Sequence, residues 1–156
     1  MKFRSLCVIA AMLFLAACQT SPQSGANAGG TAAASSVTPG SREDFVQNVG
    51  DRVFFDFDKS NIKPEGQQTL ERQAAWLKKY PNVKVTVEGH CDDRGTREYN
   101  LALGARRANA VKRALVALGI DANRITTISY GKERPAVIGD NEAAWAQNRR
   151  GVTVVQ

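Results

Sequence analysis

The chain is 156 residues long, 43% of its residues are apolar and 23% are charged, and its formal net charge is +6. This length favours one folded domain with accessory segments, and the composition is ordinary for a soluble globular protein. Without Lys2 and Arg4, which lie in a segment that we expect to be removed, the net charge is +4. A mild basic excess is compatible with an anionic partner but identifies none.

The first 18 residues have the plan of an export signal. Lys2 and Arg4 form a positive start, residues 6–15 are an almost unbroken apolar run, and Leu-Ala-Ala-Cys ends at Cys18. A transmembrane helix needs about 20 apolar residues, so this run is too short to span a bilayer comfortably, and no later segment approaches that length. Because export takes the chain out of the cytoplasm, nucleic acid is not an expected partner.

The end of this signal resembles the lipobox of bacterial lipoproteins, although the cysteine of an ordinary signal peptide could stand there by chance. The resemblance implies that a signal peptide over residues 1–17 is removed and that Cys18 carries acyl chains on its thiol and on the new N-terminus. Two or more acyl chains give stable membrane anchoring. The residue after the cysteine is Gln19 and not Asp. In enterobacterial lipoproteins, a residue other than Asp at this position permits sorting to the outer membrane.

Residues 18–41 are expected to form a lipid-anchored flexible linker. From residue 19 to residue 41 there is no charged side chain, and most residues are Gly, Ala, Ser, Thr, Pro, Asn or Gln. Such a composition cannot bury enough apolar surface to offset the entropy of ordering. A chain of this length has an average reach of roughly 25–30 Å. An unremarkable disordered N-terminus would have the same composition, so the tether interpretation depends on the lipid.

A folded domain is predicted over residues 42–156, where charges and periodic patterns begin. Residues 53–57 alternate as a strand, and residues 83–88 alternate as a second, half-buried strand. Between them, Pro64 suits the first turn of a helix that Pro81 ends. The residues expected to face the core are Val53, Phe55 and Phe57 in the first strand, Leu70, Ala74 and Leu77 in the helix, and Val83, Val85 and Val87 in the second strand.

The longest helix is predicted over residues 97–118, with Thr96 as its N-cap and Gly119 directly after its end. Its core stripe is expected to consist of Leu101, Ala105, Ala108, Val111, Leu115 and Leu118. The remaining predicted elements are a third strand, a short helix and a last strand, over residues 125–130, 141–148 and 151–155. Strands that alternate with helices imply an α/β fold, one sheet with helices packed against it.

The densest polar stretch, residues 90–95, joins the second strand to the long helix. In layered α/β folds, ligands bind beyond the carboxyl ends of the strands. Asp58 lies just after the carboxyl end of the first strand, as Asp92 lies after that of the second. If the two strands are parallel neighbours, both carboxylates emerge at one rim of the sheet.

The long helix brings an arginine to the same rim. Arg107 lies about 90° from the centre of the apolar stripe, whereas Arg106 points about 170° away from it and is expected to be solvated. Asn100 and Leu103 precede Arg107 on the same flank. Two carboxylates and a guanidinium make a mixed-charge pocket that suits a zwitterion, because arginine binds a carboxylate and aspartate binds an ammonium group.

Other interpretations of these residues are weaker or purely structural. A salt bridge between Asp92 and Arg107 could simply pin the helix, and this alternative stays open. A Cys91–His90 nucleophile pair is not expected, because adjacent residues of an extended segment point to opposite faces. A metal site lacks ligands, since His90 is the single histidine of the chain and structural metal sites need several such donors.

Residues 86–111 closely resemble the OmpA-like peptidoglycan-binding domain family, and within it the lipoproteins of the Tol–Pal system. They begin Thr-Val-Glu-Gly-His-Cys-Asp-Asp-Arg-Gly and include Asn-Leu-Ala-Leu-Gly-Ala-Arg-Arg-Ala. Supporting stretches are residues 53–59, 129–137 and 142–150. The resemblance implies a two-layer α/β domain of order β-α-β-α-β-(short α)-β, with a mixed sheet and helices packed on it.

The resemblance also implies a function: noncovalent binding of the peptidoglycan stem peptide at its diaminopimelate, with no cofactor and no catalysis. The motif positions that bind ligand in the family correspond here to Phe57, Asp58, Asp92 and Arg107, with Asn100 and Leu103 on further contact positions. The closing motif at residues 148–150 is expected to be structural. The family's lipoproteins also bind TolB and engage TolA during envelope constriction.

Two residues depart from the family pattern. Cys91 stands where relatives commonly have a small or hydroxyl residue, and we expect it to be buried and inert. Arg97 stands where many have proline, which weakens the helix start slightly. Two alternative functions remain: an OmpA-like lipoprotein of another envelope system, and an enzyme that acts on peptidoglycan. For the enzyme, the pair of carboxylates could in principle do acid–base work, but a nearby arginine would hold both ionised.

Overall fold

The computed structural model of the chain describes residues 37–156. The predicted signal peptide, Cys18 and most of the predicted linker lie outside the described residues, so their boundaries stay predictions. The elements in chain order are α1 (Arg42–Asp44), η1 (Phe45–Val49), β1 (Arg52–Phe54), α2 (Pro64–Lys79), β2 (Val85–His90), α3 (Arg97–Ala117), η2 (Ala122–Arg124), β3 (Ile125–Gly131), α4 (Glu142–Asn148) and β4 (Arg150–Val155). Each strand and long helix that the sequence predicts is present, which confirms the α/β class.

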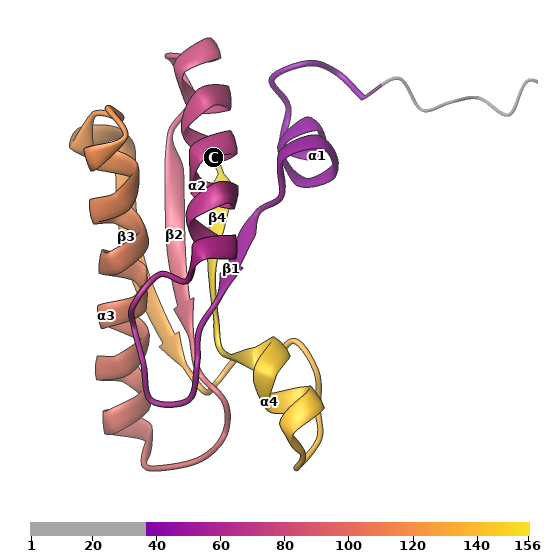
Figure 1. The fold of residues 1–156 in the computed structure, drawn as a ribbon, viewed down its shortest axis with the longest axis vertical. Helices are drawn as coiled ribbons and strands as arrows, with labels where there is room; N and C mark the ends of the chain where they lie inside the picture. The colour runs from indigo at the N-terminus through magenta and orange to yellow at the C-terminus, as the bar shows by residue number, and fades with distance from the viewer. Residues whose placement is uncertain (1–36) are drawn as a thin grey trace, which may run out of the picture. The chain divides into compact units, whose positions relative to one another are not determined.

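The four strands form one mixed sheet in the order β1-β4-β2-β3 (Figure 1). β2 and β3 are parallel, while β4 runs antiparallel to both β1 and β2. β1 and β2 therefore run in the same direction, but they are not neighbours, because β4 lies between them. Their carboxyl ends still lie at one edge of the sheet, and this edge carries the polar loops.

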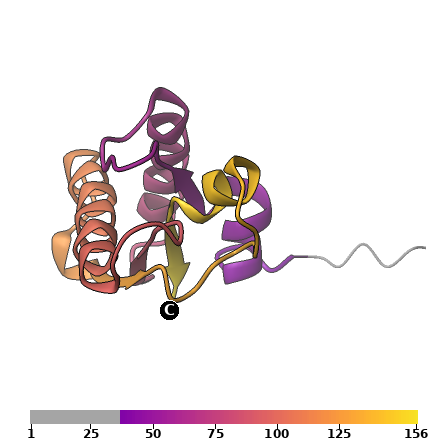
Figure 2. The ribbon, with the colours of Figure 1, turned by 90° about the horizontal axis from the view of Figure 1, so that it is seen from below.

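The helices α2 and α3 cover the same face of the sheet (Figure 2). Their stripes meet the inward residues of the strands, and the buried cluster includes Leu70, Ala74 and Leu77 of α2 together with Val85 and Val87 of β2. These five are among the predicted core residues. Burial of each leucine or valine side chain stabilises the fold by about 1.5–3 kcal/mol.

The ends of α3 follow local sequence signals. The Thr96 hydroxyl accepts a hydrogen bond from the main-chain N–H of Tyr99 at 3.2 Å, which satisfies one of the free donors of the first turn. Gly119 adopts φ 91° after the last turn. The N–H groups of Gly119 and Ile120 donate to the carbonyls of Val116 and Leu115, the hydrogen-bond pattern that closes many helices at a left-handed glycine.

A glycine pair sets how closely α3 approaches β2. A Cβ atom added to Gly89 would lie 1.8 Å from the carbonyl oxygen of Gly104, and one added to Gly104 would lie 2.3 Å from the Ser129 hydroxyl. No larger side chain fits at this crossing. The close approach lowers the first half of α3 onto the carboxyl ends of the strands, where the predicted site lies.

The first strand is shorter than predicted. β1 ends at Phe54, and Phe57, which was expected on the buried face, is 56% exposed. Only Phe55 continues the pairing, through its N–H to the Arg149 carbonyl at 2.9 Å. The chain then turns away from β4, and Asp58 adopts φ 57°, a left-handed conformation that few residues other than glycine tolerate.

The core stripe of α3 is also partly different from the prediction. Ala108, Val111 and Leu115 are buried as expected, but Leu101, Ala105 and Leu118 are only half-buried. In the first half of the helix the buried residues are instead Asn100, Leu103, Gly104 and Arg107. The reason is that this half packs against the loops at the sheet edge as well as against the strands.

The segment before β1 was not predicted as an element. Ser41 caps α1 through a hydrogen bond from the Asp44 N–H at 3.1 Å. Asp44 accepts the indole N–H of Trp76 at 2.8 Å, and Phe45 packs its ring edge-on against that indole at 4.9 Å between centroids. These contacts hold α1 and η1 against α2. Within residues 37–156, no helix combines the length and the apolar character needed to cross a bilayer.

Candidate ligand-binding site

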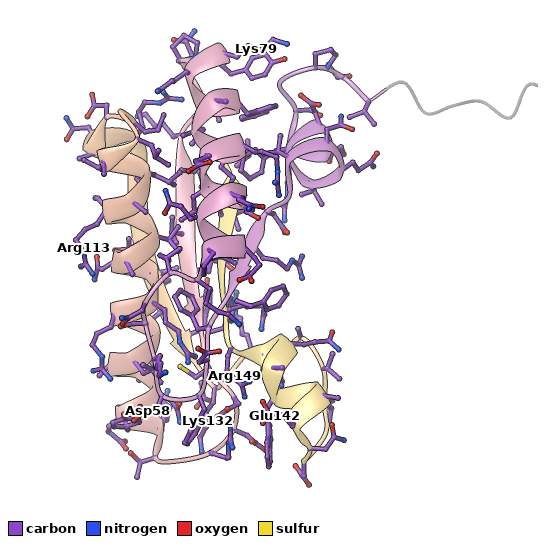
Figure 3. The ribbon with its side chains drawn as sticks, in the orientation of Figure 1. Asp58, Lys79, Arg113, Lys132, Glu142 and Arg149 are labelled. Carbon is purple, nitrogen blue, oxygen red and sulfur yellow. The ribbon has the colours of Figure 1, made fainter. Side chains whose placement is uncertain are left out.

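The candidate site lies at the sheet edge where β1 and β2 end. The loop after β1, the loop over residues 91–96, the start of α3 and the helix α4 all meet at this end of the molecule, where Figure 3 shows Asp58, Lys132, Glu142 and Arg149. Lys132 ties the second of these loops down by donating to the carbonyls of Asp93 and Gly95 at 3.0 and 2.7 Å. All six site residues that the sequence predicts within the domain belong to this region.

Asp92 is the most enclosed carboxylate of the site, 4% exposed. One of its oxygens, Oδ2, accepts hydrogen bonds from Arg94 Nη2 at 2.5 Å and from Arg149 Nη1 at 3.3 Å. Arg149 in turn binds the Phe55 carbonyl at 3.0 Å and Glu142 at 2.5 Å. Asp92 therefore lies between two guanidinium groups, which are partners of the kind that a buried carboxylate requires.

Arg107 is completely buried, and its partners differ from both sequence expectations. Its guanidinium donates to the main-chain carbonyls of His90, Lys59 and Asp56 at 2.8, 2.9 and 3.1 Å. It forms no ion pair with Asp92, so the predicted salt bridge is absent from the described residues. Arg107 does turn towards the sheet rim, but there the chain's own carbonyls occupy three of its five N–H groups.

This arrangement gives Arg107 a clear structural task. The carbonyls of Asp56 and Lys59 belong to the loop after β1, and the carbonyl of His90 ends β2. One side chain from α3 thus joins the ends of two strands that are not neighbours in the sheet. Burial lowers the pKa of the Arg107 guanidinium from its ordinary value, and the nearby Cys91 and Asp92 partly oppose this effect.

The four other predicted residues line or support a surface pocket of about 160 Å³. Its walls are formed by Phe57, Asp58, Arg94, Gly95, Tyr99, Asn100 and Leu103. Asn100 is buried and donates to the carbonyls of Arg94 and Thr96 at 2.7 and 3.0 Å. It therefore fixes the main chain of the 91–96 loop rather than offering its amide freely. Leu103 forms the apolar floor next to it.

Asp58 is exposed and already has a partner within the pocket. One of its carboxylate oxygens accepts a hydrogen bond from the Tyr99 hydroxyl. This bond raises the pKa of Tyr99, with burial as the next cause. Tyr99 was not among the predicted site residues, although it precedes Asn100 on α3. Its hydrogen bond to Asp58 joins residues 41 positions apart in the chain, and a contact at this separation cannot be predicted from a local sequence pattern.

Arg94 is the most informative residue that the sequence interpretation missed. Its guanidinium carbon lies 4.0 Å from the ring centroid of Phe57 and 4.0 Å from that of Trp145. A cation between two aromatic faces is stabilised by both rings. The position of Arg94 in a polar loop, two residues after Asp92, is a weak sequence signal for a site residue. Its contact with Trp145 could not be predicted from the sequence, because Trp145 lies in α4, far along the chain.

The neighbouring residues His90 and Cys91 do not form a reactive pair. His90 faces Glu88, with 3.3 Å between Nε2 and the carboxylate, whereas the Cys91 thiol points to the Asn100 carbonyl at 3.4 Å. Burial lowers the pKa of His90 to about 4, with the charge of Arg150 as the next cause. Burial also raises the pKa of the Cys91 thiol. Among the described residues, no cluster of His, Cys, Asp and Glu could hold a metal ion.

Comparison with known proteins identifies the class to which this fold and site belong. The sequence profile described as "OmpA family" matches residues 54–149, and the chain belongs to the OmpA family.

Similar curated proteins narrow the likeness within that family. A protein of Agrobacterium fabrum named peptidoglycan-associated lipoprotein is 55% identical over 145 residues, which cover 92% of this chain and 82% of that protein. A protein of the same name from Haemophilus influenzae is 46% identical over 149 residues, covering 96% and 95% of the two chains.

Solved structures agree. The crystal structure of the peptidoglycan-associated lipoprotein from Burkholderia pseudomallei matches with a TM-score of 0.66 and 45% identity, over 68% of this chain and 90% of that one. The C-terminal domain of Helicobacter pylori MotB matches with a TM-score of 0.63 at 26% identity, over 68% and 84% of the two chains. The fold predicted from the sequence is confirmed by these likenesses.

Proposed function

We propose that this chain is an outer-membrane lipoprotein that binds peptidoglycan noncovalently and so tethers the membrane to the cell wall. The lipid is carried by Cys18, residues 19–41 are the tether, and the domain over residues 42–156 binds the diaminopimelate of the stem peptide. The names of its relatives, peptidoglycan-associated lipoprotein, support the binding of peptidoglycan and the lipid anchor. The same relatives support a binding role without catalysis.

The single observation that carries the proposed ligand is the charge pattern at the sheet edge. Asp92 offers a desolvated carboxylate, and Asp58 offers a second one at the mouth of the pocket beside Phe57. The guanidinium groups of Arg94 and Arg149 lie within hydrogen-bond distance of Asp92. Diaminopimelate presents ammonium and carboxylate groups together, so it can satisfy both signs of charge at once.

Two of the proposed contact residues act in different ways. Phe57 exposes its ring beside the pocket, where it can cover the aliphatic part of a stem peptide. Arg107 lies behind the pocket and holds the loop after β1 in place through Asp56 and Lys59. Its guanidinium is fully buried and carbonyls occupy three of its five N–H groups, so it supports the pocket from behind.

The test of the proposed ligand is sedimentation of the full-length chain with purified peptidoglycan. Asp92→Asn keeps the shape of the side chain and removes its charge, and the matched control is Asp93→Asn at the exposed neighbouring position. We expect at least about tenfold weaker binding for Asp92→Asn and unchanged binding for the control. Free diaminopimelate should compete with the wild-type chain. Equal retention by both variants would remove the basis for the site.

The proposed partners TolB and TolA require a separate experiment. Co-purification of TolB with the full-length chain would place the protein in the Tol–Pal system and associate it with envelope constriction at division. An OmpA-like lipoprotein of another envelope system would bind peptidoglycan without retaining TolB. Incubation with purified sacculi should release no soluble fragments, because the site binds and does not cleave.

A further inference from the structure

The ion pair between Arg94 and Asp92 occupies the place that the proposed ligand needs. A ligand ammonium must approach Asp92, but Arg94 Nη2 already lies 2.5 Å from the same carboxylate. Arg94 also forms part of the wall of the 160 Å³ pocket between Phe57 and Asn100. Its guanidinium therefore stands between the buried carboxylate and the open pocket.

Among Arg94, Arg107 and Arg149, Arg94 is also the most exposed and has the fewest hydrogen-bond partners. Its side chain is 31% exposed, against 7% for Arg149 and complete burial for Arg107. Arg149 is held further by Glu142, and Arg107 is held by three carbonyls. Arg94 has one ion pair, with Asp92, and two ring contacts.

The hydrogen bonds of Arg94 are incomplete in the free protein. Its Nε is buried, and no acceptor for it is found among residues 37–156. The indole N–H of Trp145, one of the two rings beside it, is unpaired in the same sense. Buried donors without acceptors are uncommon and unfavourable, so an incoming acceptor at this point would be stabilised.

The main chain of this loop does not need to move for the side chain to turn. The Arg94 carbonyl is held by the amide of Asn100 at 2.7 Å, and Lys132 holds the carbonyls on both sides of it in the loop, at Asp93 and Gly95. The rings of Phe57 and Trp145 contact the guanidinium without a directional hydrogen bond. It can therefore turn between them while its backbone stays in place.

We propose that Arg94 is a specificity-determining residue that exchanges partners when ligand binds. The ligand's ammonium takes the place of Arg94 at Asp92, and the released guanidinium binds the carboxylate on the same carbon of the ligand. One internal ion pair is replaced by two ion pairs with the ligand. The fork of N–H groups of arginine matches a carboxylate in two parallel hydrogen bonds.

This inference rests on the proposed function and names the part of the ligand that is recognised. The stem-peptide residue diaminopimelate differs from lysine by one carboxylate on the carbon that bears the side-chain ammonium group. An ammonium alone can displace Arg94 from Asp92, but it leaves the released guanidinium without a partner. Arg94 therefore favours diaminopimelate over lysine at this position.

The experiment compares two stem peptides that are identical except for diaminopimelate or lysine. Their affinities for the full-length chain are measured by calorimetry for the wild type, for Arg94→Gln and for Arg113→Gln. The control makes the same charge change on α3 at a position that points away from the site (Figure 3). Thermal melting of each variant checks that the domain remains folded.

The wild type should bind the diaminopimelate peptide roughly ten- to a hundredfold more tightly than the lysine peptide, as a charge-assisted pair warrants. Arg94→Gln should lose most of this preference through weaker binding of the diaminopimelate peptide, while its affinity for the lysine peptide stays the same or rises. Arg113→Gln should behave as the wild type does. Arg94→Lys, which keeps the charge without the fork, should retain an intermediate preference.

Two results would overturn the inference while leaving the proposed function intact. In the first, Arg94→Gln keeps the full preference for diaminopimelate. In the second, it weakens both peptides equally, as expected if Arg94 only braces the loop. A wild-type chain that binds neither peptide would instead contradict the proposed function itself.

Discussion

Replacement of Arg107 by methionine should destabilise the domain even without ligand. The substitution keeps a long side chain but removes the three hydrogen bonds to the carbonyls of Asp56, Lys59 and His90. The His90 contact is fully buried, so leaving its carbonyl without a donor should cost about 1–3 kcal/mol. Loss of each of the two partly buried hydrogen bonds should cost about 0.5–1.5 kcal/mol more. The apolar methionine and the relief of a buried charge offset part of this.

The net loss in the free energy of unfolding should be about 2–4 kcal/mol. With a denaturant slope of roughly 2 kcal/mol per molar urea, the middle of the range for small domains, the urea midpoint should fall by about 1–2 M. The matched control is Arg106→Met at the adjacent, exposed position of α3, which should change stability by no more than about 0.5 kcal/mol. Equal midpoints for the two variants would show that the Arg107 guanidinium does not hold the strand ends together.

Three further predictions concern stability. Gly89→Ala should cost about 1–3 kcal/mol or more in chemical denaturation, because its Cβ would lie 1.8 Å from the Gly104 carbonyl oxygen; a stability equal to wild type would contradict this crossing. Thr96→Ala should cost about 1 kcal/mol through loss of the α3 cap, whereas Thr96→Asn should restore it. Burial lowers the pKa of His90 from 6.5 to about 4. Between these two pH values the unfolded chain binds a proton at His90 that the folded chain does not, so the free energy of unfolding should fall as the pH falls from 6.5 to 4. The loss should be at most about 3 kcal/mol. The slope of unfolding free energy against pH in this window should be shallower in His90→Asn, and parallel slopes would refute the assignment.

Much of the fold could be predicted because the signals are local. The helix α2 begins at Pro64 and ends before Pro81, and its buried stripe recurs at helical spacing. The cap at Thr96 and the left-handed Gly119 delimit α3 in the same way. Each of these features depends on residues within one or two turns of one another, so a linear sequence displays it directly.

The errors arose where the partner lies far away in the chain. β1 stops at Phe54, and where it stops depends on pairing with β4, about a hundred residues later. The turn at α1 has no period of its own and exists because Trp76 binds Asp44 across 32 positions. Distance along the sequence hides such contacts, whatever their strength in the folded protein.

The candidate site shows the same division. Sequence alone placed Asp58, Asp92 and Arg107 at one edge of the sheet, since strand direction and helix phase determine which end and which flank a residue occupies. It could not assign their partners, because an ion pair depends on a few ångströms that only the packed structure sets. The close crossing of Gly89 and Gly104 lies next to the carbonyls that hold Arg107, and Trp145 of α4 contacts the same guanidinium of Arg94 that pairs with Asp92. Local sequence patterns thus determine which residues lie at this edge of the sheet. Tertiary packing determines which of their charged groups form ion pairs.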